Sequence, residues 1–207
     1  YMFSSRPIRA SIQFLQDTAT DSEAFIARLA GVRIGRALSG YLATGTGTSQ
    51  PKGVTSFAVG KQGAVGQTTS ITYDDALDVV HSVNPAYRGA RCRWAMADSS
   101  LKVFRKLKDS TGRPLWEPSL QLGQPDTLLG YAVTIDDKMP AMAASAKSIA
   151  FGDFESGLVV RAVNGGGLIR LEERYADSLQ VGFIAFGRYD STIDDAAAVR
   201  LYQNSAT

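Results

Sequence analysis

Residues 41–54 read YLATGTGTSQPKGV, and the placement of this stretch decides which folds and functions suit the chain. Its GTG motif follows a long apolar run, which predicts a Gly-rich loop directly after a helix. A phosphate-binding loop needs the opposite order, in which a strand precedes the glycines and Gly-Lys-Ser/Thr opens a helix. Here Lys52 is followed by Gly53, and Gln50 stands where the dinucleotide pattern GxGxxG requires its third glycine. Nucleotide binding therefore remains only an alternative hypothesis.

The run before this loop predicts a helix over residues 21–43. Thr20 and Glu23 have the spacing of a capping box at a helix N-terminus. Apolar residues occur on more than one side of the helix, which indicates an element packed on two sides. Gly31 and Gly35 lie inside it, and each lowers helix stability by about 1 kcal/mol relative to Ala. We interpret these two glycines as points where another element approaches closely.

The remainder of the chain mixes helices and strands without a regular βαβ series, which indicates an α+β fold with a sheet in each of two subdomains. We expect an extended segment over residues 1–16, a hairpin or loop pair over 54–70, and a Pro-rich loop over 109–126. Caps and apolar spacing predict two further helices: 72–84, and 98–108 with Asp98 or Ser99 as its cap. Runs of β-forming residues predict strands: 92–97, 128–135, 148–151, 158–163, 168–171, 179–186 and 199–202.

Composition excludes several classes of protein. Apolar residues make up 44% of the 207 residues and charged residues 20%, so the chain can bury a core. Lysine plus arginine total 22 and aspartate plus glutamate 20, a balance that neither requires nor excludes nucleic acid. With His81 as the only histidine and Cys92 as the only cysteine, the chain cannot build a Cys/His zinc site or an internal disulfide. No apolar run reaches the roughly 18 residues of a membrane span.

Catalytic constellations are weak in this sequence. His81 is interpreted as a structural histidine on or near a helix surface, and Cys92 as an inert thiol in an apolar strand. The basic side of the helix at 98–108 is interpreted as a solvated face. Adjacent acids point in different directions in a helix or a strand, so no pair is a ready acid–base couple: Asp74–Asp75, Asp136–Asp137, Glu172–Glu173 and Asp194–Asp195. We therefore expect no enzyme, no cofactor and no metal.

Four segments, in order along the chain, resemble the major capsid proteins of tailed bacteriophages of the Hong Kong 97 type. The predicted helix running into residues 45–53 is similar to the family's spine helix and its Gly-rich loop. Residues 125–139 (PDTLLGYAVTIDDKM) are similar to a recurrent family segment, and residues 149–154 (IAFGDF) to a recurrent turn. Residues 187–190 (GRYD) are close to a common family ending, in which Ser191 replaces a glycine.

The resemblance implies two domains. A peripheral (P) domain with the spine helix and an elongated sheet would hold residues 1–70 and the long strands of 159–192. An axial (A) domain with a central sheet flanked by helices would hold residues 71–158 and the terminal strand of 193–207. The family also has an N-terminal arm and an E-loop before the spine helix. We expect both to be absent here, so that the chain is a truncated subunit.

The function that the resemblance implies is structural. Subunits would assemble into pentamers and hexamers of an icosahedral, DNA-containing head, in the virion, after assembly in the bacterial cytoplasm. The implied partners are further copies of the chain, a scaffolding domain or protein, a portal, a maturation protease and non-specifically packaged DNA, with no membrane. An encapsulin-like compartment shell shares the fold and is the first alternative. A soluble phosphate- or nucleotide-binding enzyme that uses residues 45–53 is the alternative of another class.

Two loops supply the candidate residues for contacts between subunits. The Gly-rich loop follows the predicted spine helix, and the resemblance places the Pro-rich loop near the axis of a capsomer. The candidates are Gly45, Gly47, Gln50, Pro51, Lys52, Gly53, Arg113, Pro114, Leu115 and Trp116.

Overall fold

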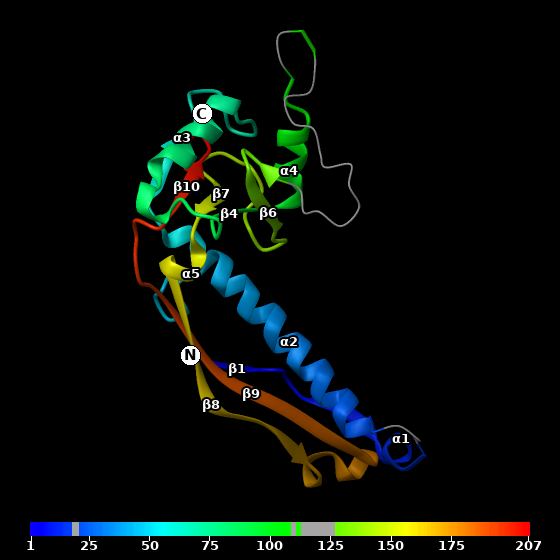
Figure 1. Cartoon of the computed structure of the whole chain (residues 1–207). Helices are drawn as coiled ribbons and strands as arrows, with labels where there is room; N and C mark the ends of the chain where they lie inside the picture. Colours follow the sequence, from blue (N-terminus) through cyan, green and yellow to red (C-terminus); the bar gives the residue numbers. More distant parts are fainter. Residues whose placement is uncertain (18–20, 109–110, 113–126) are drawn as a thin grey trace.

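Two sheets, each with its own helices, make up the fold (Figure 1). The structure is a computed structural model that describes residues 1–17, 21–108, 111–112 and 127–207. One sheet is long and narrow, and a long helix runs beside it; the other sheet lies beyond the C-terminal end of that helix (Figure 1). We call these two parts the elongated lobe and the sheet lobe.

The described helices and strands have the following bounds. The helices are α1 Ile12–Asp17, α2 Ser22–Thr44, α3 Tyr73–Ser82, α4 Asp98–Arg105 and α5 Phe154–Gly157, with short 3₁₀ turns η1 Val54–Ser56, η2 Pro85–Tyr87 and η3 Glu173–Ser178. The strands are β1 Met2–Ser4, β2 Ile8–Ser11, β3 Val59–Gln62, β4 Arg93–Met96, β5 Thr127–Leu128, β6 Tyr131–Ile135, β7 Lys147–Gly152, β8 Leu158–Leu171, β9 Gln180–Ile193 and β10 Val199–Gln203.

Strand β9 is the axis of the elongated lobe. Along one side it pairs antiparallel with β8, from Leu158 opposite Ile193 to Leu171 opposite Gly182. Along its other side it pairs antiparallel with β1 and β2, which come from the start of the chain. The two strands predicted at 158–163 and 168–171 are therefore one strand, β8, with a single register shift between Val163 and Gly167.

Helix α2 begins where Asp21 accepts a hydrogen bond from the backbone N–H of Ala24 at 3.0 Å. Asp21 therefore caps the helix, whereas Thr20, the capping residue expected from the sequence, lies outside the described residues. Glu23 in the first turn also forms an ion pair at 2.6 Å with Arg170 of β8, which ties the start of the helix to the sheet. The predicted spine helix is thus confirmed, shifted by one residue at each end.

From Ser22 to Ile34, α2 is buried on one side. Ile26, Ala30 and Ile34 are spaced four apart and are buried, and Ile26 packs with Val181 and Phe183 of β9. A second stripe stays exposed on the outer side of the helix: Phe25 at 51%, Leu29 at 36% and Val32 at 44%. The prediction that the helix packs on two sides is therefore wrong for this part of α2 in the subunit by itself. At the C-terminal end, Ala43 lies 18 residues after Phe25, on the same side of the helix, and is buried.

Two of the three glycines of α2, Gly31 and Gly35, likewise have no close neighbour in the described part of the chain. A Cβ atom added at Gly31 or Gly35 would meet no atom within 4 Å apart from the helix's own nearby backbone. The predicted close approach of another element is therefore wrong within the described part of the subunit. Local propensity alone makes both positions less favourable than alanine in an exposed helix.

The sheet lobe has the strand order β3-β10-β7-β4-β6-β5. Side chains alternate between its two faces along each strand. On one face, Trp94 and Phe151 have ring centroids 4.6 Å apart, and they share a buried cluster with Phe104 of α4 and Val79 of α3. The other face, represented by Ala150 of β7, belongs to a second buried cluster.

This second cluster joins the two lobes. Ala43 from the end of α2 and Phe57 after η1 pack with Ala150, Val199 and Leu201 of the sheet lobe, and all five are buried. We call this cluster the joint. Each fully buried aliphatic or aromatic side chain contributes about 1.5–3 kcal/mol, so the joint is a substantial part of the core.

Several predictions about local structure are corrected by pairings that are distant in sequence. Residues 54–70 form η1 and β3 and not a hairpin, because β3 pairs in parallel with the C-terminal strand β10. Residues 1–16 are not all extended, because α1 follows β2. The strand predicted at 128–135 is the hairpin of β5 and β6, whose turn holds Leu129 and Gly130 at φ of 53° and 81°. Helix α4 begins after Ala97 without the side-chain cap that was expected from Asp98 or Ser99.

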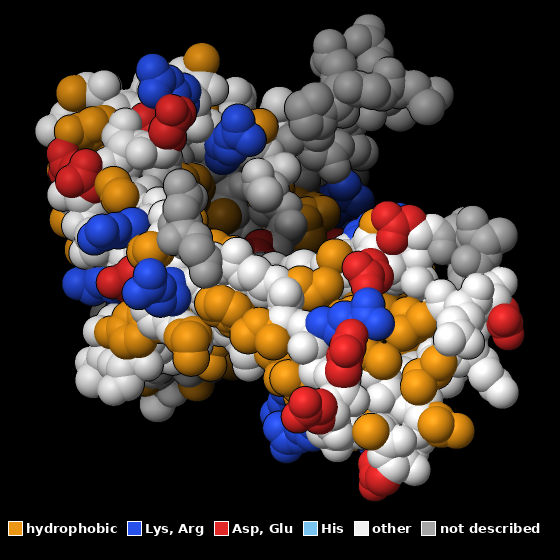
Figure 2. All heavy atoms as spheres, turned by 90° about the horizontal axis from the view of Figure 1, so that it is seen from below, with side chains coloured by type: hydrophobic (Ala, Val, Ile, Leu, Met, Phe, Trp, Pro, Cys, Tyr) orange, Lys and Arg blue, Asp and Glu red, His pale blue; other side chains and the backbone are white. Residues whose placement is uncertain are grey.

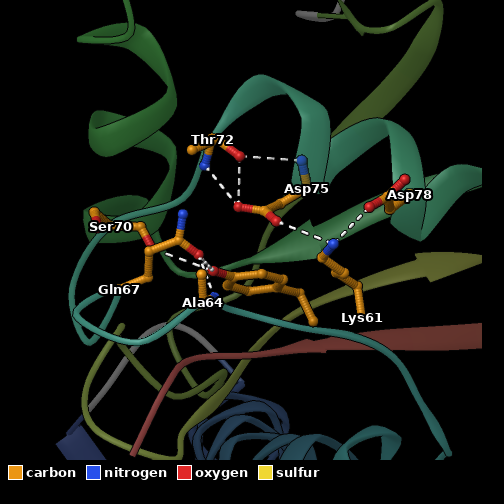
Figure 3. A network of polar contacts seen from close by, with 8 residues as sticks. Lys61, Ala64, Gln67, Ser70, Thr72, Asp75 and Asp78 are labelled. Carbon is orange, nitrogen blue, oxygen red and sulfur yellow. Dashed lines mark hydrogen bonds and ion pairs between the residues drawn. The ribbon is translucent and has the colours of Figure 1, made fainter. Parts of the chain in front are cut away.

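A polar network fixes β3 to helix α3 (Figure 3). The predicted start of this helix is confirmed: Thr72 caps it and forms a reciprocal capping box with Asp75. The Lys61 Nζ of β3 lies 3.5 Å from one carboxylate oxygen of Asp75 and 2.6 Å from Asp78. Burial raises the pKa of the neighbouring Tyr202 to about 12, with a smaller contribution from the charge of Asp75.

The same network controls the charge of Asp75. Burial would raise the pKa of this carboxyl, since only 6% of the residue is exposed. The hydrogen bonds from the Thr72 hydroxyl and backbone N–H, together with the positive charge of Lys61, outweigh burial and hold the pKa below its ordinary value.

Acidification tests this network. A carboxyl with a lowered folded-state pKa stabilises the fold at pH values above its ordinary pKa of about 3.9, and the contribution is lost as the pH falls through the folded pKa. We expect Asp75→Asn to lower the free energy of unfolding by about 1–2 kcal/mol at pH 7. In urea titrations, this difference should shrink below about pH 4. Asp78→Asn, at a side chain that is 56% exposed, is the matched control and should have a small effect. An Asp75→Asn deficit that is the same at pH 3 and pH 7 would contradict this account.

The exposed glycines of α2 give a second test. We expect Gly31→Ala to raise the free energy of unfolding of the subunit by about 1 kcal/mol, because no described residue occupies the space of the new methyl group. Gly152→Ala is the opposite control: Gly152 has a φ of 150°, and its Cβ would lie 2.1 Å from the carbonyl oxygen of Ala198. This variant should lose more than about 1 kcal/mol. Destabilisation by Gly31→Ala in urea titrations would show that an element does approach the helix there.

Candidate functional site

The Gly-rich loop, residues 45–53, begins where α2 ends and lies beside the joint. Its two ends are held together: the backbone N–H of Gly53 donates to the carbonyl oxygen of Gly45 at 2.8 Å. One antiparallel bridge between Thr46 and Lys52 continues this pairing toward the tip. The loop is therefore a small hairpin on the end of the helix, and its tip is formed by the exposed residues 46–49.

Close backbone contacts explain the first and last glycines of the motif. A Cβ at Gly45 would lie 2.1 Å from the carbonyl oxygen of Pro51, and a Cβ at Gly53 would lie 2.5 Å from the backbone nitrogen of Gly45. Any other residue would force the backbone apart. The middle glycine has a different reason, because Gly47 has a φ of 82°, which side chains rarely adopt.

Two serines anchor the loop from outside. The Ser56 hydroxyl of η1 donates to the carbonyl oxygen of Gly45 at 2.9 Å. The Ser191 hydroxyl of β9 donates to the carbonyl oxygen of Lys52 at 2.7 Å, and the backbone N–H of Lys52 donates to the carbonyl oxygen of Ser191 at 3.1 Å. Sequence reasoning missed the role of both serines. The one available signal was that Ser191 departs from the family's glycine.

The structure divides the predicted contact residues of this loop into two groups. Gly45, Pro51 and Gly53 are buried within the subunit and build the loop. Gly47 is exposed and Gln50 and Lys52 are half-buried, so these three remain accessible to another molecule. The other four candidates lie outside the described residues: Arg113, Pro114, Leu115 and Trp116.

The backbone of the loop is not arranged for phosphate binding. The N–H groups of Gly45, Lys52 and Gly53 donate to carbonyl oxygens of the chain, and that of Thr48 lies 3.4 Å from the Thr46 hydroxyl. The loop also follows the C-terminal end of α2, where the helix dipole carries partial negative charge and repels an anion. The geometry therefore removes the basis for the phosphate- or nucleotide-binding alternative.

The single histidine and the single cysteine have structural surroundings. His81 is exposed on α3, and its Nδ1 lies 3.0 Å from the guanidinium of Arg88. Cys92 is buried, and its thiol donates to the carbonyl oxygen of Tyr87 at 2.9 Å. Burial raises the pKa of the Cys92 thiol, so it stays protonated and unreactive at neutral pH. His81 thus lies on a helix surface as expected, and Cys92 is buried as expected but directly precedes β4 and is not part of it.

The acid pairs also have local partners. Lys138 lies 2.7 Å from Asp137 and lowers the pKa of that carboxyl, and the Tyr87 hydroxyl donates to Asp195 and lowers its pKa in the same way. Asp75 belongs to the cap of α3. Within the described ranges, no three acids, histidines or cysteines lie together as a metal site would require.

A pocket of 420 Å³ opens beside the joint. Its apolar wall includes Val54, Met139 and Phe154, and its charged rim includes Arg91, whose guanidinium lies 3.4 Å from Glu155. The remaining lining residues are Arg93, Ala95, Thr134, Asp136, Asp153 and Leu158.

Apolar side chains are unusually prominent on the surface of the elongated lobe. Seen from below, they form patches interrupted by charged groups (Figure 2). In β8 even consecutive residues are exposed, Val159 at 44% and Val160 at 46%, so both faces of this strand meet solvent. Leu179 after η3 is 68% exposed. Surfaces of this kind are typical of protein–protein interfaces. Of the helices whose residues the structure describes, none combines the length and apolarity needed to cross a bilayer.

Comparisons with known proteins match the chain to a family of capsid proteins. The Phage capsid family matches residues 4–204, whereas no curated protein matches the chain. The capsid of the native GTA particle is 28% identical, with a TM-score of 0.84 over 100% of this chain and 73% of that chain. A structure from Mycobacterium phage Bobi is 14% identical, with a TM-score of 0.67 over 100% and 72% of the two chains. The holo-SrpI encapsulin complex from Synechococcus elongatus PCC 7942 is 15% identical, with a TM-score of 0.67 over 100% and 75%.

These similarities confirm the α+β capsid fold expected from the sequence, and the similar proteins are shells and not enzymes. The family match extends over almost every described element, from β1 to β10. Because the family model matches residues 4–204 of the 207, the chain belongs to the phage capsid family.

Proposed function

We propose that the chain is a major capsid subunit of a tailed phage or prophage, which assembles into pentamers and hexamers that close into an icosahedral head around DNA. The observation that carries this proposal is the end-to-end similarity to the capsid of the native GTA particle, at 28% identity over 100% of the chain. Packing between copies, and not chemistry, is then the mechanism. Closed shells need such repeated heterologous contacts between identical subunits.

The exposed surfaces of the elongated lobe support the same proposal. The outer stripe of α2 (Phe25, Leu29 and Val32) and the two-sided exposure of β8 present apolar area that a monomer would leave in water. Burial of apolar area gives about 25 cal/mol per Å², so covering these surfaces by neighbouring copies would drive assembly. We accordingly expect the subunit to be most stable within the shell.

The two lobes correspond to the P and A domains that the resemblance implies. We propose that the P domain consists of residues 1–53 and 158–193, and that the A domain consists of residues 59–152 and 199–207. Strand β3 supports moving the first boundary from residue 70 to before Val59, since β3 pairs with β10 in the sheet lobe. The intervening residues contribute to the joint.

The partners in this proposal are those of a phage head. They are further copies of the chain, a scaffolding domain or protein, a portal, a maturation protease and non-specifically packaged DNA. Assembly would take place in the bacterial cytoplasm and leave the protein in the virion capsid. Genes for a portal, a protease and a terminase beside the gene for this chain would support this set of partners.

An encapsulin-like shell is the second candidate, because the holo-SrpI encapsulin complex has the same fold. At 15% identity that likeness concerns the fold alone. The GTA capsid is nearer in both sequence and structure, which favours a capsid. A gene for a cargo enzyme beside the gene for this chain would reverse this preference.

The Gly-rich loop and the Pro-rich loop at 110–126 are the proposed contact sites between subunits. In the Gly-rich loop, the buried glycines and Pro51 shape the hairpin, and the exposed tip at residues 46–49 makes the contact. This assignment makes the tip the position where a substitution affects assembly and leaves the fold of the subunit unchanged.

Thr48→Arg tests the proposed function and the contact together. The wild-type protein should form closed shells or capsomers, visible by electron microscopy and as large species in sedimentation velocity. Thr48 is exposed, so we expect Thr48→Arg to unfold at the wild-type urea midpoint and to reduce the assembled fraction at least tenfold. That reduction corresponds to about 1.4 kcal/mol of contact energy.

Thr69→Arg makes the same substitution at an exposed position before α3, away from the Gly-rich loop, and should assemble like the wild type. Equal loss of assembly in both variants would contradict the assigned contact. A wild-type protein that stays monomeric at high concentration would contradict the proposed function itself.

A further inference from the structure

Ser191 of β9 and Lys52 of the Gly-rich loop form two hydrogen bonds in opposite directions. The backbone N–H of Lys52 donates to the carbonyl oxygen of Ser191 at 3.1 Å, and the Ser191 hydroxyl donates to the carbonyl oxygen of Lys52 at 2.7 Å. Ser191 is only 6% exposed, so water does not readily replace the hydroxyl bond. The first bond needs only the backbone, but the second exists only because the residue is a serine.

Lys52 lies where this bond has the greatest effect on the loop. It bridges to Thr46 across the small hairpin, and the Thr46 hydroxyl in turn accepts from the Gln50 side chain at 2.8 Å. The next residue, Gly53, closes the hairpin onto Gly45 at 2.8 Å. Fixing the position of Lys52 therefore also fixes Thr46, its bridge partner, where the exposed tip begins.

The position of Ser191 in β9 determines where the loop is held. Ser191 lies opposite Val160, close to the ends of β8 and β9 that meet the joint. The loop itself grows from the end of α2. The Ser191 hydroxyl thus links the loop at the end of α2 to the hairpin of β8 and β9.

We propose that Ser191 is the positioning residue of the Gly-rich loop: its hydroxyl fixes the Lys52 end of the hairpin against β9 and so sets the direction in which the tip at 46–49 is presented to a neighbouring subunit. The presentation of the tip rests on the proposed function, whereas the restraint on the loop is a property of the subunit alone. A serine that merely stabilises the whole fold would have no such local effect.

Hydrogen exchange of the unassembled protein tests the restraint. We expect Ser191→Ala to speed exchange of the hydrogen-bonded backbone amides of Gly45, Lys52 and Gly53 about fivefold, because the variant lacks one hydrogen bond that opposes opening of the hairpin. Amides of β4 and β7 in the sheet lobe should keep their wild-type rates. Ser191→Thr retains the donor and should exchange at the wild-type rate. Ser82→Ala, which removes a hydroxyl donor to the Val79 carbonyl in α3, is the matched control and should leave the loop unchanged.

The outcomes separate the proposal from a general effect on stability. Unchanged loop exchange in Ser191→Ala, equal acceleration in every element, or equal acceleration in Ser191→Thr would each overturn the restraint. In assembly assays, Ser191→Ala should produce at least threefold fewer closed shells than the wild type, and Ser191→Thr should match the wild type. If Ser191→Ala assembled as well as the wild type, the proposed role of Ser191 in directing the loop tip toward a neighbouring subunit would be overturned. Failure of the wild type itself to assemble would overturn the proposed function and leave the exchange result to decide the restraint.

Discussion

The backbone contact between Gly45 and Gly53 is the constraint on which the rest of the structure depends. It closes the loop at 2.8 Å on the end of α2, in a space that admits no Cβ atom at either position. Because the loop turns back there, the chain continues into η1 and places Phe57 in the joint. The orientation of the helix relative to the sheet lobe follows from this arrangement, and so does the outward position of the loop tip.

The same contact also makes the loop a poor site for binding a phosphate. Glycines that serve a phosphate leave their amides free, whereas the amides of Gly45, Lys52 and Gly53 are used by the chain's own carbonyl oxygens. Asp75 and Asp78 likewise pair with Lys61, and Asp137 pairs with Lys138. The described part of the subunit leaves apolar area exposed along α2 and β8. An uncovered apolar surface on a rigid frame is what a self-assembling shell requires.

The sequence predicted the elements whose signals are local. The apolar spacing of Ile26 and Ile34 specifies α2, the capping box of Thr72 and Asp75 specifies the start of α3, and the Gly-rich motif marks the loop correctly. Pairings between distant segments could not be predicted from the sequence. The pairing of β3 with β10 and the joining of β8 into one long strand depend on partners over a hundred or several tens of residues away, for which a single sequence carries no signal. The contact candidates were predicted as one group, and only the structure separates the buried Gly45, Pro51 and Gly53 from the exposed tip.

The exposed apolar residues on the outer side of α2 are the part of the subunit that the proposed shell would cover. Its apolar residues predicted packing on two sides, and the subunit covers one. The most direct test is a cryo-electron microscopy reconstruction of particles assembled from the full-length protein. The account predicts a closed icosahedral shell in which Phe25, Leu29 and Val32 are buried against neighbouring subunits. A shell that leaves this stripe in solvent, or a protein that remains monomeric at high concentration, would contradict it.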